Sequence, residues 1–136
     1  MSKKPKPKNK VKPWIYWTPR VLSIVFILFI SLFSLDVFGT GLGFWGTTFA
    51  FLMHNIPSFV LIIVLLFAWR HELVGAIIFT LFGLLYIIRL AATIIMNANQ
   101  PDALPWFVAI TWSMTIAGPA LLTGILYFIN WRLKKT

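Results

Sequence analysis

The stretch VLSIVFILFISLFSL, from Val21 to Leu35, contains no charged side chain and decides the fold class. Thr18 followed by Pro19 is typical of a helix start, with Thr18 as the N-cap and Pro19 at the first helical position. From Pro19 to Phe38 an α-helix of about 20 residues is about 30 Å long, which equals the thickness of the hydrocarbon core of a bilayer. We therefore expect a transmembrane helix over about 19–38. A cleaved signal peptide is disfavoured because its apolar region is usually only about 7–15 residues long.

The composition of the whole chain agrees with a membrane protein. Of its 136 residues, 60% are hydrophobic and 11% are charged, and none is cysteine. A soluble domain carries about 25% charged residues, so a water-soluble fold is excluded. The lack of thiols also excludes disulfides, thiolate metal sites and dithiol redox chemistry.

Three more apolar segments follow, over about 47–69, 73–96 and 105–131. A glycine-rich connection over 39–46, three residues at 70–72 and a polar segment at 97–102 separate the four segments. The connection over 39–46 contains a formal G-x-G-x-x-G match, which we discount because no strand precedes it. We predict an all-α integral membrane bundle of four transmembrane helices with antiparallel up-down connections, forming one domain over 14–136.

The distribution of basic residues predicts the orientation. Eleven of the twelve Lys and Arg residues lie in the N-terminal segment, at 70 or at the C-terminus, and Arg89 is the exception. The positive-inside rule then places both termini in the cytoplasm of a multi-pass cell membrane protein. Residues 1–13 are expected to form a disordered basic tail. This tail fixes orientation and also offers contacts to anionic lipid headgroups through Lys3, Lys4, Lys6, Lys8, Lys10 and Lys12.

Three ionisable residues in the predicted outer half of the spans form the candidate site. Asp36, His54 and Arg89 come from different helices but fall at similar depths, and ionisable residues within a span mark a functional-site hypothesis. In the simplest arrangement Asp36 pairs with Arg89. Polar neighbours at helical spacing extend the candidate site for a ligand or proton: Ser58, Tyr86, Thr111 and Thr115. Such networks also stabilise helix packing, and that structural interpretation stays open.

Two prolines are predicted to kink their helices. Pro57 and Pro119 each remove a backbone hydrogen bond, freeing the carbonyls of Met53 and Thr115. Interrupted helices mark binding sites in some transporters. The small residues Gly75, Gly83, Gly118 and Gly124 are adequately explained as points of close helix packing.

The sequence has too few suitable residues for the known catalytic and cofactor chemistries. Haem held by two histidines would need His54 and His71 at one depth, and a zinc site would need more ligands than Asp36 and His54. We expect no catalytic residue, no metal and no cofactor. Nucleic-acid binding is not supported, because the aromatic residues beside the basic tail fit a membrane interface better.

Short motifs resemble those of an uncharacterised family of small prokaryotic four-helix integral membrane proteins. They are WTPR at 17–20, FSLDVF at 33–38, HNIP at 54–57, AWR at 68–70, AGP at 117–119 and GILYF at 124–128. The resemblance covers roughly 17–131 and implies no known activity. It places Asp36, His54, Pro57, Gly118 and Pro119 within recurring patterns.

Three functions are compatible with these features. We favour a non-enzymatic accessory or interaction protein, with the lipid bilayer and either a membrane-protein partner or a second copy of the chain as partners. The alternative is a small oligomeric transporter or proton-linked channel. A membrane enzyme that acts on lipid comes third.

Overall fold

The computed structural model describes residues 11–97 and 105–135, and all regular structure in them is helical. The described chain contains five α-helices and one 3-10 helix, η1. They are α1 (Pro13–Leu32), η1 (Phe33–Gly39), α2 (Gly43–His54), α3 (Ile56–Arg70), α4 (Glu72–Asn97) and α5 (Trp106–Lys135). The predicted headgroup-contacting lysines up to Lys10 lie outside the described residues.

Three of these helical segments are long and apolar enough to cross a membrane: Pro13–Gly39, Glu72–Asn97 and Trp106–Lys135. The pair α2 and α3 adds a fourth if it is counted as one span, bent by 44° at the break between its two helices. The all-helical, membrane-compatible class is thus confirmed, whereas the second predicted span consists of two helices rather than one.

The first helix begins earlier than predicted. Pro13 occupies the start of α1, and Pro19 lies inside the helix. The Thr18 hydroxyl donates to the Trp14 carbonyl at 2.6 Å, one turn back in the same helix, so it does not cap a helix N-terminus. Pro13 and Pro19 are both suited to the first turn of this helix. The helix begins at Pro13, because the residues from Trp14 to Thr18 are already helical.

The glycine-rich connection is shorter than predicted. Only Thr40 to Leu42 separate η1 from α2, and the backbone reverses at Gly41 and Gly43, both with φ of +69°. A residue with a side chain adopts this conformation with difficulty, whereas glycine does so freely. Two such positions suffice for the reversal. Residues 43–46, which were predicted as part of the connection, therefore belong to α2.

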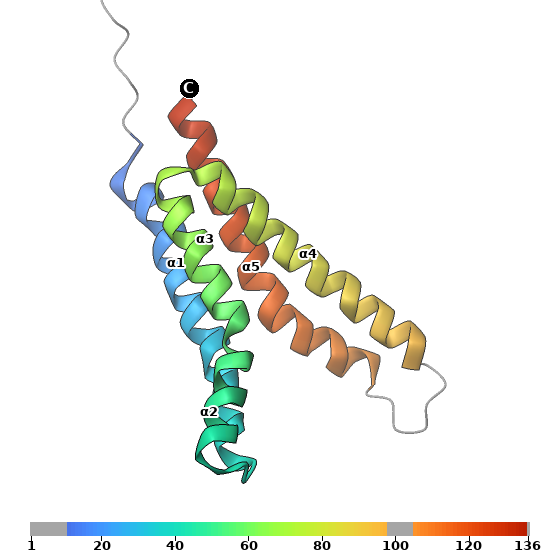
Figure 1. Ribbon diagram of the computed structural model, residues 1–136. Coiled ribbons are helices and arrows are strands. Elements are labelled where there is room, and N and C mark those ends of the chain that lie inside the picture. Colours follow the sequence, from blue (N-terminus) through green and yellow to red (C-terminus); the bar gives the residue numbers. More distant parts are fainter. Residues whose placement is uncertain (1–10, 98–104, 136) are drawn as a thin grey trace, which may run out of the picture.

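The helices meet at one end of the molecule and separate at the other (Figure 1). At the closed end, where the start of α1, the α3–α4 connection at His71 and the C-terminal part of α5 lie together, α1 and α3 pack side by side against α4 and α5. At the open end, the α4–α5 pair diverges from η1 and α2. The core therefore lies toward the closed end.

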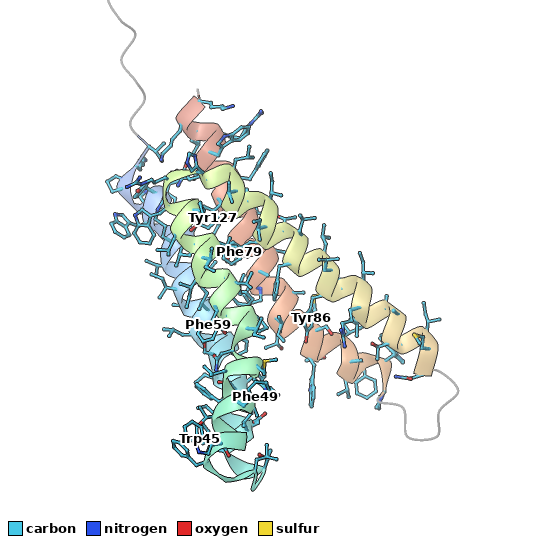
Figure 2. The ribbon with its side chains drawn as sticks, in the orientation of Figure 1. Trp45, Phe49, Phe59, Phe79, Tyr86 and Tyr127 are labelled. Atoms are coloured by element: carbon cyan, nitrogen blue, oxygen red, sulfur yellow. The ribbon has the colours of Figure 1, made fainter. Side chains whose placement is uncertain are left out.

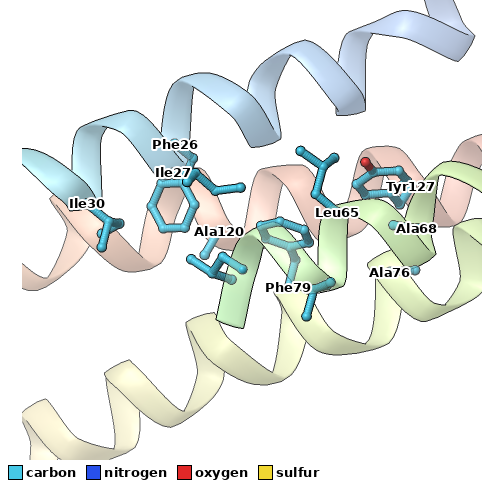
Figure 3. Close-up of a cluster of buried hydrophobic side chains, with 11 residues drawn as sticks. Phe26, Ile27, Ile30, Leu65, Ala68, Ala76, Phe79, Ala120 and Tyr127 are labelled. Carbon is cyan, nitrogen blue, oxygen red and sulfur yellow. The ribbon is translucent and has the colours of Figure 1, made fainter. Parts of the chain in front are cut away.

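That core is a single cluster of apolar side chains (Figure 3). Phe26 of α1, Leu65 of α3, Phe79 of α4 and Tyr127 of α5 are among its buried members, and the rings of Phe79 and Tyr127 stack with centroids 6.0 Å apart. Every long helix contributes to it, which fixes their mutual positions at the closed end.

Glycines allow α4 and α5 to approach closely. A Cβ built on Gly124 would lie 2.3 Å from the Thr80 hydroxyl oxygen, and one on Gly75 would lie 2.9 Å from the Tyr127 ring. Gly83 meets Leu121 in the same way. Gly118 has no atom within 4 Å of such a Cβ, so it is not a close-approach point.

Candidate functional site

A groove of about 670 Å³ opens between the two diverging groups of helices. One side is formed by Ile30 of α1, Phe33 of η1, His54 of α2 and Pro57 of α3. The other side is formed by Phe82 and Tyr86 of α4 and Trp112, Thr115 and Ile116 of α5. Tyr86 is seen in Figure 2 on the part of α4 beyond the core, toward the open end.

The break between α2 and α3 shapes one wall of this groove. Asn55 is the only residue between the two helices, and both His54 and Pro57 beside it line the groove. Pro57 lies in the first turn of α3, where a missing N–H costs no helical hydrogen bond. The Asn55 side chain donates to the Phe51 carbonyl at 3.0 Å and so ties the break to α2.

The polar groups of the groove are only partly satisfied within the chain. His54 Nδ1 lies 2.9 Å from the Ala50 carbonyl oxygen, and the Thr115 hydroxyl donates to the Thr111 carbonyl at 3.0 Å. Since a carbonyl only accepts, Nδ1 of His54 carries a hydrogen, and Nε2 of the neutral ring is an acceptor. In the described part of the chain, no hydrogen bond engages the Tyr86 hydroxyl or the Trp112 indole N–H.

The structure brings some of the predicted site residues together and separates others. His54, Tyr86 and Thr115 line one groove, whereas Asp36, Arg89 and Thr111 do not. Within 11–97 and 105–135, the ion pairs do not include one between Asp36 and Arg89, and both side chains are exposed. The expected pairing of these two residues is therefore wrong, because η1 and the far end of α4 lie on helix groups that diverge.

Ser58 is the most enclosed of the predicted site residues. Its side chain is 1% exposed, and its hydroxyl oxygen has no hydrogen-bond partner in the described structure. It follows the groove residue Pro57 in the first turn of α3. An unsatisfied buried hydroxyl is uncommon, and Ser58 is not among the residues that line the groove.

A second group of polar residues lies at the closed end and was not predicted as a site. Glu72 Oε1 accepts hydrogen bonds from Arg20 at 2.9 Å, Asn130 at 3.1 Å and Lys134 at 2.6 Å. We call Arg20, Glu72, Asn130 and Lys134 the buried polar cluster, although Lys134 itself is 44% exposed. The other three are almost completely enclosed, with Arg20 and Asn130 at 0% and Glu72 at 4%.

Aromatic rings and carbonyls complete the surroundings of Arg20. Its guanidinium carbon lies 3.6 Å from the ring centroid of Tyr16, and the rings of Trp69 and Tyr127 lie 5.7 and 5.9 Å away. The guanidinium also donates to the Trp69 carbonyl at 3.0 Å and to the Tyr16 carbonyl. Cation–π contacts and hydrogen bonds thus compensate for the loss of water around a charge.

Sequence reasoning counted Arg20 among the basic residues that set orientation and placed Glu72 in the connection at 70–72. Both are drawn inside because Glu72 is the first residue of α4 and points back into the helix junction, where α1 presents Arg20. A usable signal was the spacing of Asn130 and Lys134, which lie one turn apart on one face of α5. Two donors on that face indicate an acceptor opposite them.

Neither region assembles a metal-ligand set. In residues 11–97 and 105–135, no three His, Asp or Glu side chains come close enough together to hold a metal ion. What the groove offers instead is an apolar surface with a few hydrogen-bonding groups. This arrangement suits the binding of a ligand by shape and hydrogen bonds.

The fold and the groove define a class: an all-helical protein with three to four helices apolar enough to cross a membrane and a groove between them. Within this class the chain belongs to the family described as Domain of unknown function (DUF7670), whose model matches residues 7–136. The resemblance to an uncharacterised family is thereby confirmed over nearly the whole chain. No curated protein and no solved structure matches the chain.

Proposed function

We propose that the protein is a non-enzymatic accessory protein of the cell membrane that binds a membrane-resident ligand in the groove. The observation that carries this proposal is the convergence of His54, Tyr86 and Thr115, from three helices, on one groove of about 670 Å³. Pockets for small molecules have volumes of about 300–1,000 Å³, with mostly apolar walls and a few polar groups. The groove has the size and the surface of such a pocket.

Filling the groove tests this proposal. Thr115→Trp places a large ring in the groove, and Thr48→Trp is the matched control, since Thr48 is also exposed and donates to a carbonyl one turn back but does not line the groove. Native mass spectrometry from mild detergent measures the bound ligand. We expect wild type and Thr48→Trp to retain a lipid-sized adduct and Thr115→Trp to lose about tenfold in occupancy, a change of about 1.4 kcal/mol. Equal occupancy in all three proteins would contradict ligand binding in the groove.

We infer a topology of four spans with both termini in the cytoplasm, α2 and α3 together forming the second span. Two observations support this topology. The start of α1, the α3–α4 connection and the end of α5 lie at the same end of the molecule (Figure 1). The sequence also has its excess of Lys and Arg in these segments. The absence of cysteine makes labelling direct. A membrane-impermeant maleimide applied to intact cells should label Thr40→Cys and leave His71→Cys unlabelled. The reverse pattern would overturn the orientation.

A small transporter or proton-linked channel is the second candidate, and the break at Asn55 favours it. α2 and α3 contain 12 and 15 residues, so the break lies near the middle of the combined span. Transporters often bind substrates where a helix is interrupted near the middle of the membrane. Proteoliposomes with a pH-sensitive dye inside distinguish the two functions. Proton flux that His54→Ala abolishes supports transport, whereas no flux above that of empty liposomes supports the accessory function.

A further inference from the structure

We propose that the ligand of the groove is an uncharged lipid whose polar part carries both a hydroxyl group and a carbonyl oxygen, as diacylglycerol does. This inference rests on the proposed function and names the chemistry of its ligand. Three features of the groove lead to it: apolar walls, a specific complement of donors and acceptors, and the lack of charge.

The walls are suited to a hydrocarbon chain. Ile30 and Phe33 face the groove from one side, and Phe82 and Ile116 face it from the other. All four belong to helical segments that are long and apolar enough to cross a membrane. A ligand that enters between these segments comes from the bilayer, and its apolar part gains burial against side chains from both sides.

The polar groups indicate which atoms the ligand must present. Because His54 Nδ1 donates to the Ala50 carbonyl, its remaining nitrogen accepts, and a ligand hydroxyl is a suitable donor for it. Tyr86 and Trp112 bring an O–H and an N–H that have no partner in the described residues, and a ligand carbonyl is a suitable acceptor for either.

The groove contains no charge that could compensate a charged headgroup. None of its lining residues is Lys, Arg, Asp or Glu, and Arg89, one turn beyond Tyr86 on α4, is not among them. Burying a phosphate among apolar walls without a counter-charge is strongly unfavourable. An uncharged polar group with both kinds of hydrogen bond avoids this cost.

The experiment uses the full chain in phosphatidylcholine nanodiscs and three photoactivatable probes with the same diazirine-bearing chain. The first is a diacylglycerol, the second is a phosphatidylglycerol, and the third is a plain hydrocarbon. After irradiation, mass spectrometry of peptides measures labelling at the groove. We expect the diacylglycerol to label it at least fivefold more than either other probe, about the effect of one net hydrogen bond of 1 kcal/mol.

Variants then test the assigned contacts. Tyr86→Phe and His54→Phe each keep a ring but remove the hydrogen-bonding group, and we expect each to lower diacylglycerol labelling by about fivefold. Thr48→Val, which removes a hydroxyl outside the groove, should leave labelling unchanged. A loss of labelling in Thr48→Val as large as in the two ring variants would contradict the assigned contacts.

The outcomes distinguish a failure of the proposed ligand class from a failure of the proposed function. Equal labelling by the diacylglycerol and hydrocarbon probes, insensitive to the ring variants, would overturn the uncharged hydroxyl and carbonyl class while leaving a binding groove. Preferential labelling by phosphatidylglycerol would overturn it in favour of an anionic lipid. If none of the three probes labels the groove above the lipid-facing surface of α2, the proposed function itself fails.

Discussion

The closed and open ends of the molecule differ in what their polar side chains contact. At the closed end, Glu72 accepts from Arg20, Asn130 and Lys134, so its charge is buried with partners inside the chain, although Arg20 Nε and Asn130 Oδ1 have no partner in the described residues. At the open end, the Tyr86 hydroxyl and the Trp112 indole N–H line the groove and have no partner in the described residues. Polar groups satisfied internally stabilise a fold, whereas groups left unsatisfied beside a groove are available to a ligand. The difference supports a structural role for the buried polar cluster and motivates the proposal that the groove binds a ligand.

The largest expected effect comes from breaking the buried polar cluster. Glu72→Gln removes the negative charge and leaves the enclosed Arg20 guanidinium without its counter-ion. Breaking one member of a buried ion pair costs about 3–5 kcal/mol, so we expect the free energy of unfolding to fall by about 3 kcal/mol. Reversible unfolding in mixed micelles with increasing dodecyl sulfate measures it.

The matched control for this variant is Asp36→Asn, which neutralises an exposed carboxylate outside the cluster. We expect it to change the free energy of unfolding by less than about 0.5 kcal/mol. Equal effects of the two substitutions would show that burial of the cluster contributes nothing to stability.

A smaller effect is expected from filling the contact between α4 and α5. Gly124→Ala puts a methyl group 2.3 Å from the Thr80 hydroxyl oxygen and 2.9 Å from the Thr80 backbone nitrogen. Overpacking of this kind costs about 1–3 kcal/mol. Gly118→Ala, on the same helix but in open space, should cost nothing. Thermal unfolding in detergent compares them, and similar melting temperatures would contradict the close approach.

Two buried serines provide a comparison between a satisfied and an unsatisfied hydroxyl. The Ser23 hydroxyl donates to the Pro19 carbonyl at 2.7 Å and lies 3.3 Å from the Tyr127 hydroxyl, whereas the Ser58 hydroxyl has no partner in the described chain. We expect Ser23→Ala to lower the free energy of unfolding by about 1 kcal/mol, and Ser58→Ala to leave it unchanged or raise it in delipidated protein. Unfolding in mixed micelles measures both changes in the free energy of unfolding. An equal decrease for Ser58→Ala and Ser23→Ala would show that the Ser58 hydroxyl has a hydrogen-bond partner.

The smallest effect is expected from Lys134→Ala. Its ammonium group lies 2.6 Å from Glu72 Oε1 but is partly exposed, and Arg20 remains to pair with Glu72. Ion pairs of exposed side chains contribute about 0–1 kcal/mol and weaken with salt. The loss should stay below about 1 kcal/mol and shrink in high salt. A larger, salt-independent loss would assign Lys134 to the enclosed part of the cluster.

Much of the architecture is predictable because membrane insertion imposes long uncharged segments. The segment over 73–96 predicts α4 within one residue at each end, since the charged and polar residues beside it are unambiguous. The break at Asn55 was not predicted as a separate pair of helices, because a proline in a sequence indicates a kink without giving the angle between the segments.

The candidate site was predictable residue by residue only where facing helices stay close. His54, the last residue of α2, and Tyr86 of α4 line the same groove between the two diverging groups of helices. Asp36 and Arg89 were assigned similar depth, but depth along a span does not give lateral distance, and the divergence of the helices keeps them from pairing. The buried polar cluster was missed for a related reason: charge counting uses Arg20 only for orientation and leaves Glu72 in a connection, whereas tertiary packing encloses both.

The divergence of the helices has a consequence for the bilayer itself. A molecule whose helices are joined at the closed end and spread at the open end has a larger cross-section in one leaflet than in the other (Figure 1). The lipids around the protein must adapt to this wedge shape, so the free energy of inserting the protein depends on the curvature of the membrane. If the closed end faces the cytoplasm, as proposed above, we expect the protein to favour membranes whose outer leaflet is expanded relative to the inner one. Its partition between small and large vesicles measures this preference, and equal partition would argue against it.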